Sequence, residues 1–184
     1  MNLIEGVVTS VNLSKKHAFS KSSCLTINLI AGIGVEGDAH AGRTVKHRYL
    51  VGKNPNKVNI RQVHLMHSEL FDEVNRKGFD VKAGDLGENI TTRGVDLLKC
   101  PTNTKLFIGS NVVIQLTALR NPCSQIDRFQ EGLLKELVYY DCKGNVVCKA
   151  GVMGVVLVGG LVQAGDAINV NIPNGTCKNL EYVW

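Results

Sequence analysis

Six short runs of β-type residues constrain most strongly how this 184-residue chain can fold. Turn-forming segments rich in glycine, asparagine and proline separate them, and the 19 glycines suit a sheet that must bend sharply. Many short strands at this spacing are typical of a β-barrel or a β-sandwich. The runs lie at residues 3–11, 23–30, 59–66, 111–119, 151–158 and 167–172.

Two further segments predict helices. In residues 67–78, Ser68 is placed to cap the first turn and Gly78 to end the helix. In residues 127–140, Asp127 is followed three positions later by Gln130, as in a capping box. The buried faces are expected to be Leu70, Phe71 and Val74 in the first helix, and Leu133, Leu134 and Leu137 in the second.

The length and the order of these elements indicate one domain. A chain of 184 residues fits one domain with a sizeable core better than two small ones. Strands and helices do not alternate regularly, as a doubly wound sheet would require. We therefore predict a single, mainly β domain over residues 1–184 with a few short helices.

Charge and hydropathy exclude several classes of protein. The formal net charge is +5, and the basic residues are scattered, so the sequence does not indicate nucleic acid binding. A small anionic ligand would suit this charge. The N-terminus lacks the features of a signal peptide, and no window approaches the length of a membrane span. We expect a cytoplasmic protein with neither nucleic acid nor a membrane as its partner.

The six cysteines are expected to be free thiols, because no secretory signal accompanies them. No C-x-x-C pair is present, which argues against a structural zinc site or a ferredoxin-type cluster. If the protein carries out redox chemistry, its electrons must therefore come from outside the chain.

Cys123 stands out because it follows Pro122 directly at the end of an apolar run, in RNPCSQID. If Asp127 caps the next helix, Cys123 lies just before a helix N-terminus, and Arg120 adds a nearby cation. Both effects favour the thiolate, the form needed for a nucleophile or a metal ligand. A buried, inert thiol remains an equal alternative from the sequence alone.

The glycine-rich segment GIGVEGDAHAGR, residues 32–43, could bring backbone N–H groups close to an anionic ligand. Asp38, His40 and Arg43 would add polar side chains. The spacing matches neither a P-loop nor a dinucleotide fingerprint. A glycine-rich turn with a solvated Asp38 is the alternative interpretation.

The segment GDLGENITTRG, residues 84–94, combines closely spaced glycines with Glu88, Asn89 and Arg93. It could offer hydrogen bonds to a heterocycle and a cation to a phosphate. It could equally be a loop held by its own side chains.

Two other patterns favour structural roles. His64 and His67 lie at a strand-to-helix junction where their rings would point differently, so we expect core or solvated histidines and not metal ligands. Residues 160–166, GLVQAGD, are interpreted as a turn before the last strand.

Four ordered segments together resemble the MOSC domain, the family named for the C-terminal domain of molybdenum cofactor sulfurase. They are GVEGDAHAG, GDLGENITTRG, IGSNVVIQLTALRNPC and GVMGVVLVGGLVQAGDAI, and the resemblance runs from about Leu3 to Val170. It implies a MOSC-type β-barrel that binds the pterin-based molybdenum cofactor (molybdopterin).

The resemblance also implies roles for individual residues. Cys123 occupies the R-x-P-C position, so it would hold molybdenum or carry a persulfide sulfur, with Arg120 beside it. Asp38 and His40 occupy the G-D-x-H motif and Glu88 and Asn89 the G-E-N motif, while Lys21 resembles a basic position of bacterial members and Arg93 would supply a cation to the pterin phosphate. This chemistry is consistent, since a thiolate is a soft ligand suited to molybdenum and a phosphate needs nearby cations.

The chain resembles the stand-alone bacterial members, which leaves two main functions open. The first is reduction of N-hydroxylated small molecules with a Cys123-ligated molybdenum and an external electron donor. The second is a non-catalytic carrier that hands the cofactor, or a persulfide sulfur on Cys123, to a partner protein. A third hypothesis is a cysteine hydrolase that pairs Cys123 with a histidine distant in sequence.

Overall fold

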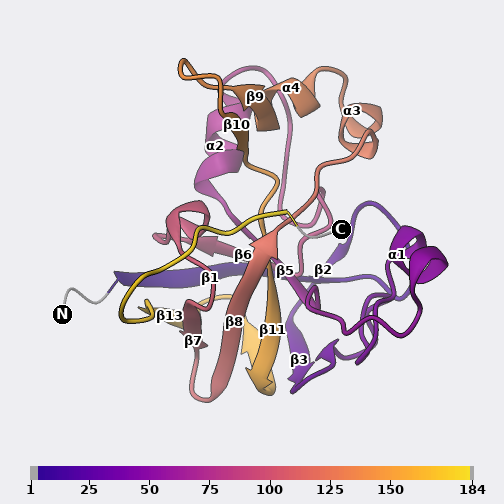
Figure 1. Ribbon diagram of the computed structural model, residues 1–184, viewed down its shortest axis with the longest axis vertical. Coiled ribbons are helices and arrows are strands. Elements are labelled where there is room, and N and C mark those ends of the chain that lie inside the picture. Colours follow the sequence, from indigo (N-terminus) through magenta and orange to yellow (C-terminus); the bar gives the residue numbers. More distant parts are fainter. Residues whose placement is uncertain (1–3, 183–184) are drawn as a thin grey trace.

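The computed structural model describes residues 4–182, in which seven strands close into a β-barrel (Figure 1). All neighbouring strands pair antiparallel except β5 and β6, which run parallel. The predicted mainly β barrel is confirmed. In order around the barrel the strands are β1 (Ile4–Leu13), β6 (Ile90–Arg93), β5 (Val63–His67), β11 (Val152–Val158), β8 (Val112–Leu119), β7 (Lys105–Ile108) and β13 (Ala167–Asn171), which pairs back with β1.

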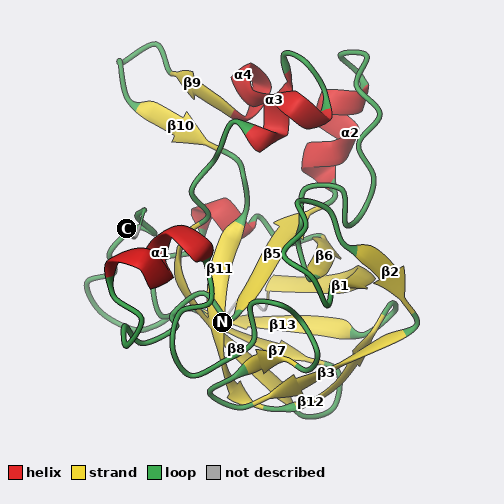
Figure 2. Cartoon of the chain, turned by 90° about the vertical axis from the view of Figure 1, so that its right-hand side faces the viewer, coloured by secondary structure: helices red, strands yellow, loops and turns green. Residues whose placement is uncertain are grey.

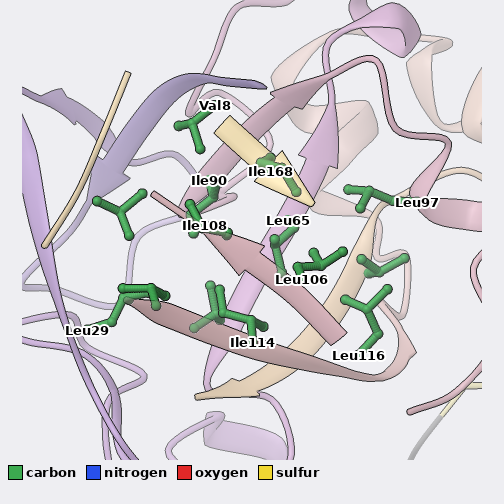
Figure 3. Packing of buried hydrophobic residues seen from close by; sticks show 14 of the residues in the cluster. Val8, Leu29, Leu65, Ile90, Leu97, Leu106, Ile108, Ile114, Leu116 and Ile168 are labelled. Carbon is green, nitrogen blue, oxygen red and sulfur yellow. The ribbon is translucent and has the colours of Figure 1, made fainter. Parts of the chain in front are cut away.

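The barrel interior is filled by alternate side chains of its strands. In β8, every second residue is buried and the residues between them are half-buried, as the period of a strand requires. Figure 3 shows branched side chains from several strands meeting inside the barrel. They include Val8, Leu65, Ile90, Leu106, Ile108, Ile114, Leu116 and Ile168, all almost fully buried.

Smaller sheets extend the barrel. The short β2 (Ser22–Cys24) pairs with the end of β1. A three-stranded sheet of β12 (Gly160–Gln163), β3 (Thr26–Ile30) and β4 (Gly34–Val35) lies at the lower end in Figure 2. One turn of 3₁₀ helix, η1 (Leu97–Lys99), follows β6.

A helical cap lies at the opposite end of the barrel (Figures 1 and 2). A second apolar core of the protein, separate from that of the barrel, fills the cap. It joins Met66 of β5 to side chains from all three cap helices. The cap consists of α2 (Glu69–Asn75), α3 (Gln125–Phe129), α4 (Leu133–Leu137) and the hairpin of β9 (Val138–Tyr140) and β10 (Val146–Cys148), while α1 (Arg48–Lys53) lies beside the barrel. Across residues 4–182, no helix is long and apolar enough to span a membrane.

The predicted helix over residues 127–140 was wrong in its extent. It is divided into α3 and α4 by Gly132, whose φ of +86° no right-handed helix contains, and the chain continues as β9. Asp127 caps α4 instead of starting a helix, because its Oδ1 accepts a hydrogen bond from the Leu134 N–H at 2.9 Å. Leu133 and Leu137 are fully buried as predicted, and Leu134 is half-buried.

Other predicted boundaries shift. Ser68 precedes α2, but its side chain makes no capping hydrogen bond, whereas Leu70, Phe71 and Val74 are buried as expected. The run at 23–30 divides at the exposed Leu25 into β2 and β3, and the run at 59–66 becomes a strand only from Val63. Residues 160–163 form β12 and not a turn.

Truncating Ile114 to alanine should lower the free energy of unfolding by roughly 2 to 5 kcal/mol, because Ile114 is fully buried inside the barrel and its loss leaves a cavity. Urea denaturation measures this change. Lys105→Ala on the outer face of β7 is the control and should change stability by less than about 0.5 kcal/mol. Equal effects of the two substitutions would contradict the position of Ile114 in the core.

Candidate functional site

An open pocket lies where the barrel meets the cap, and segments far apart in the sequence line it. The loop between β1 and β2, the stretch from residue 40 to 64, the loop before β6 and the segment after β8 all contribute. None of the described lining residues is acidic. The polar and reactive side chains among them are Lys21, His40, Lys46, His47, Asn59, Arg61, His64, Asn89, Arg120, Asn121, Cys123 and Gln125.

Cys123 reaches the pocket because β8 ends just before it. The Arg120 N–H donates to the carbonyl of Gly151 at 2.9 Å, which fixes the chain as it leaves the strand. The thiol is half-buried, and its Sγ lies 3.5 Å from Gln125 Oε1. The alternative of an inert thiol inside apolar packing is therefore not what the structure shows. Since α3 has only five residues, few aligned peptide dipoles support the predicted effect of a helix N-terminus.

Arg120 presents a buried guanidinium to the same pocket. Its Nη1 is buried and has no hydrogen-bond partner among the described residues, and its Cζ lies 5.9 Å from the centre of the Phe19 ring. Burial lowers the pKa of the Arg120 side chain, an effect that the nearby Cys123, Cys148 and Glu88 oppose. A buried cation with an unused donor is costly unless an anion binds beside it.

Asp38 lies behind the pocket wall and holds that wall in place. Its Oδ2 accepts hydrogen bonds from Lys21 Nζ at 2.6 Å and from Asn89 Nδ2 at 3.0 Å. Its Oδ1 accepts from the backbone N–H of His40 at 2.9 Å. Asp38 is 7% exposed, so the solvated-turn alternative was wrong.

Lys21 and Asp38 form a buried ion pair. Burial alone would raise the pKa of Asp38, but its hydrogen bonds with His40 and the charge of Lys21 outweigh this and hold it well below its ordinary range. Burial lowers the pKa of Lys21, and the Asp38 carboxylate offsets part of this. Lys21 thus stays fixed at the pocket with its counter-ion behind it.

The loop of residues 84–89 packs against the backbone of the β1–β2 loop. Gly84 and Gly87 adopt φ values of +88° and +83°, and a Cβ on either would lie 2.4 Å from the carbonyl oxygen of Lys21 or of Phe19. Glu88 is fully buried, and its Oε1 accepts hydrogen bonds from the Gly84 N–H and from the Thr91 hydroxyl. The loop is therefore held by its own side chains, while Gly87 and Asn89 line the pocket.

The remaining bonds of Asn89 tie the pocket to the barrel. Asn89 Oδ1 accepts from the backbone N–H of His64 at 3.2 Å, and its Nδ2 also donates to the carbonyl of Asn12 at 3.2 Å. Burial, followed by the charge of Arg120, lowers the pKa of His64, whose Nε2 lies 3.0 Å from the Ala150 carbonyl oxygen. The expectation of a core histidine is met at His64.

The structure brings most of the predicted site residues together. Lys21, His40, Asn89, Arg120 and Cys123 line the pocket. The carboxyl groups of Asp38 and Glu88 lie behind them and bond to the same loops.

Arg93 is not brought to the pocket. It ends β6 on the outer surface, where its guanidinium pairs with Asp72 and bonds to the hydroxyl of Ser68. The geometry therefore gives no support to the expected contact between Arg93 and a pterin phosphate.

Sequence reasoning missed two cations of the pocket, Lys46 and Arg61. Burial, together with the charge of Arg120, lowers the pKa of Arg61 to about 10. Lys46 is exposed at the pocket opening. Neither belongs to a glycine-rich motif, and only the folding of residues 39–61 beside the barrel brings them to the site.

The thiols and histidines of the described residues form no evident metal cage. All six cysteines are free, as expected. Over residues 4–182, no group of three or more histidine, cysteine, aspartate and glutamate side chains is placed to hold a metal ion. No described histidine hydrogen-bonds to Cys123 Sγ, which gives the hydrolase hypothesis no geometric support. A metal at this site would need most of its ligands from another molecule.

Gly87→Ala should lower the free energy of unfolding by roughly 2 to 5 kcal/mol, because it combines a left-handed backbone with a clash against the Phe19 carbonyl oxygen. Gly78→Ala is the matched control, since Gly78 has a φ of +98° and a Cβ added there would meet nothing within 4 Å. It should cost only about 1 to 2 kcal/mol. Urea denaturation of both variants measures the difference, and equal losses would count against the close packing of Gly87.

Asp38→Asn should destabilise the protein most above about pH 5 and progressively less towards pH 3. The pKa of Asp38 in the folded state lies below its ordinary value of 3.8. The carboxylate therefore stabilises the fold fully above the unfolded-state pKa and loses that contribution as the pH falls through the folded-state pKa. Urea denaturation of the wild type and of Asp38→Asn between pH 3 and about pH 7 measures this pH dependence. Asp80→Asn, whose side chain is 75% exposed, should have little effect at any pH, and a pH-independent loss for Asp38→Asn would contradict the charged pair.

Comparisons with known proteins agree with this architecture. The family model of the MOSC domain matches residues 37–169. The YuaD protein from Bacillus subtilis is 19% identical, with a TM-score of 0.75 over 94% of this chain and 99% of that chain. YiiM from Geobacillus stearothermophilus is 18% identical, with a TM-score of 0.61 over 90% of this chain and 75% of that one. YiiM from Escherichia coli is 17% identical, with a TM-score of 0.57 over 97% of this chain and 73% of that one.

The solved structures show a shared fold, and the family model adds the family. No curated protein sequence matches the chain. MOSC domains as a family are associated with the molybdenum cofactor. Because the family model spans well over half of the 184 residues and the barrel is the one expected, this chain belongs to the MOSC domain family.

Proposed function

We propose that this protein binds the molybdenum cofactor in the pocket between barrel and cap, and that it reduces N-hydroxylated small molecules with electrons from an external donor. The observation that carries the proposal is the buried, unpartnered Nη1 of Arg120 in a pocket that also contains the Cys123 thiol. An anionic ligand with a soft metal would use both groups.

The residues present fit such a ligand. Lys21, Arg61 and Arg120 surround the pocket with positive charge, which suits the phosphate of a pterin. Cys123 would serve as a thiolate ligand to molybdenum, because a soft metal prefers sulfur ligands. Most of the remaining ligands would come from the cofactor itself, consistent with the lack of a metal cage among the described side chains.

The chain's own residues would orient the substrate and deliver protons. When bound, the cofactor supplies the redox chemistry for the two-electron reduction. Cleaving the N–O bond of a hydroxylamine to an amine and water consumes two electrons and two protons. His40 lines the pocket, and its Nδ1 lies 3.3 Å from Asp38 Oδ1, so it is the group we place to relay a proton from solvent.

The accessibility of Cys123 also supports a second candidate, a carrier of the cofactor or of a persulfide sulfur. The thiol is half-buried, and a partner protein could approach it through the pocket opening. Turnover separates the two candidates. Protein that retains molybdenum and consumes an N-hydroxylated base with an artificial electron donor is a reductase, whereas metal without turnover favours the carrier.

Cys123→Ser should abolish molybdenum retention and leave the fold intact, because an alcohol is a poor ligand for a soft metal. The protein is expressed in a host that makes the cofactor, and molybdenum is measured by elemental analysis alongside the thermal unfolding midpoint. Cys142→Ser, at an exposed position in the β9–β10 turn, is the control and should retain the wild-type metal content. Undiminished molybdenum in Cys123→Ser would reject Cys123 as the ligand.

A further inference from the structure

Exposed cations border the opening of the pocket. Lys46 lines the pocket and is exposed, which places it at the opening. Lys15 and Lys16 are also exposed and precede the lining residue Ala18 by two or three positions. Arg43 is exposed, and its carbonyl accepts a hydrogen bond from the N–H of the lining residue Asn59. We call Lys15, Lys16, Arg43 and Lys46 the basic rim.

The two segments that carry the basic rim lie side by side. The ring of His17 contacts the ring of His40 edge-on, with 4.9 Å between their centres. The Ala39 N–H donates to the Ser14 carbonyl at 2.9 Å. The two segments that carry the four cations therefore meet beside the opening.

The sequence around the rim contains many cations and only two acidic residues, Glu36 and Asp38, of which Asp38 is buried and paired with Lys21. Residues 39–68 contain six lysines and arginines and no aspartate or glutamate, and residues 6–35 also lack acidic residues. Six acidic residues lie within residues 69–88, and three of them, Glu69, Asp72 and Glu73, belong to α2 of the cap. The protein therefore concentrates positive charge at the opening even though its net charge is only +5.

The rim cations make no ion pairs among residues 4–182. Elsewhere on the surface, lysines and arginines often do pair with carboxylates; the examples are Lys77, Lys82, Arg93, Lys99 and Lys149. Like charges that gather without counter-ions repel one another, but they attract a negatively charged partner from a distance.

We propose that the basic rim is the docking surface of an acidic electron-transfer protein, which delivers electrons to the pocket. This inference rests on the proposed reductase function. Each reduction of an N–O bond consumes two electrons, so the donor protein is oxidised by two electrons in total while two protons come from solvent. Docking at the opening brings the donor's redox group close to Cys123, and complementary charge speeds such brief encounters.

A protein fits this surface better than a nucleic acid does. Val58 pairs with Thr44, which lies between the rim residues Arg43 and Lys46. Its side chain is 67% exposed and offers apolar contact area. Single-stranded nucleic acids usually stack on aromatic rings. The exposed phenylalanine and tyrosine side chains that the structure describes, Phe107, Tyr139 and Tyr140, lie on β7 and β9, away from the rim, where the described aromatic rings are those of histidines such as His17 and His40.

The test uses the full-length, cofactor-loaded protein with a reduced flavodoxin, an acidic flavin protein, as the probe. The rim variant carries Lys15→Glu, Lys16→Glu and Arg43→Glu. The control variant carries Lys105→Glu, Lys143→Glu and Lys178→Glu, which make the same charge change at exposed positions outside the rim. Turnover of an N-hydroxylated base is measured with flavodoxin and, separately, with reduced benzyl viologen as a small donor, at low and at near-physiological salt.

We expect the rim variant to lose at least about tenfold of its flavodoxin-driven rate at low salt, and the control variant to stay within about twofold of wild type. The wild-type rate should fall as salt rises, because screening weakens the attraction. The viologen-driven rate of the rim variant should be unchanged or higher, since viologen is a cation.

Equal flavodoxin-driven rates in the rim and control variants would overturn the proposal, and so would viologen-driven turnover that flavodoxin cannot support. Failure of viologen-driven turnover in the wild type would instead reject the reductase function. In that case, titration of flavodoxin binding decides: weaker binding to the rim variant than to the control supports the acidic partner, and equal binding overturns it. Rim-dependent binding of a single-stranded oligonucleotide at near-physiological salt would replace the proposal with a nucleic acid partner.

Discussion

The buried carboxylate of Asp38 is the interaction on which the arrangement of the pocket depends. It joins three parts of the chain, since it bonds to Lys21 from the β1–β2 loop, to His40 two residues further along its own segment, and to Asn89 from the loop before β6. A buried charge is tolerated only when it is paired and hydrogen-bonded. The need to satisfy Asp38 therefore fixes how these three loops meet, and with them the orientation of the groups that face the pocket.

The positive charge of the pocket is only partly balanced by the described residues around it. The charge of Lys21 is balanced from behind by Asp38, whereas Arg120 has a buried Nη1 with no hydrogen-bond partner among the described residues. The described lining residues include no carboxylate that could neutralise Arg120. Such a site is preorganised for an anion, because its donors are already positioned and desolvated before the ligand arrives. Cys123 adds to this site a half-buried thiol suited to a soft metal.

Much of the fold could be predicted from the sequence. The relative positions of the site residues could be predicted only in part. The alternation of apolar residues in β8, together with the ordered motifs, was sufficient to predict a barrel in which Cys123 follows the end of a strand. Residues such as Arg61 belong to no motif, and their position follows from pairing between strands distant in sequence. The chemistry of Asp38 suggested a ligand contact, yet burial placed it behind the wall. Gly132 was overlooked within a pattern of leucines that otherwise indicates one helix.

The parallel pairing of β5 with β6 has a consequence for how the binding site and the fold are related. Parallel neighbours cannot be joined by a tight hairpin, so the chain must leave β5 at one end of the barrel and return to enter β6 in the same direction. That crossover is residues 68–89, which contain α2 and the loop with Gly84, Gly87 and Asn89. The barrel therefore requires this connection, and the same connection forms part of the cap and one wall of the pocket. A connection too short to span this return would not allow β6 to pair parallel with β5.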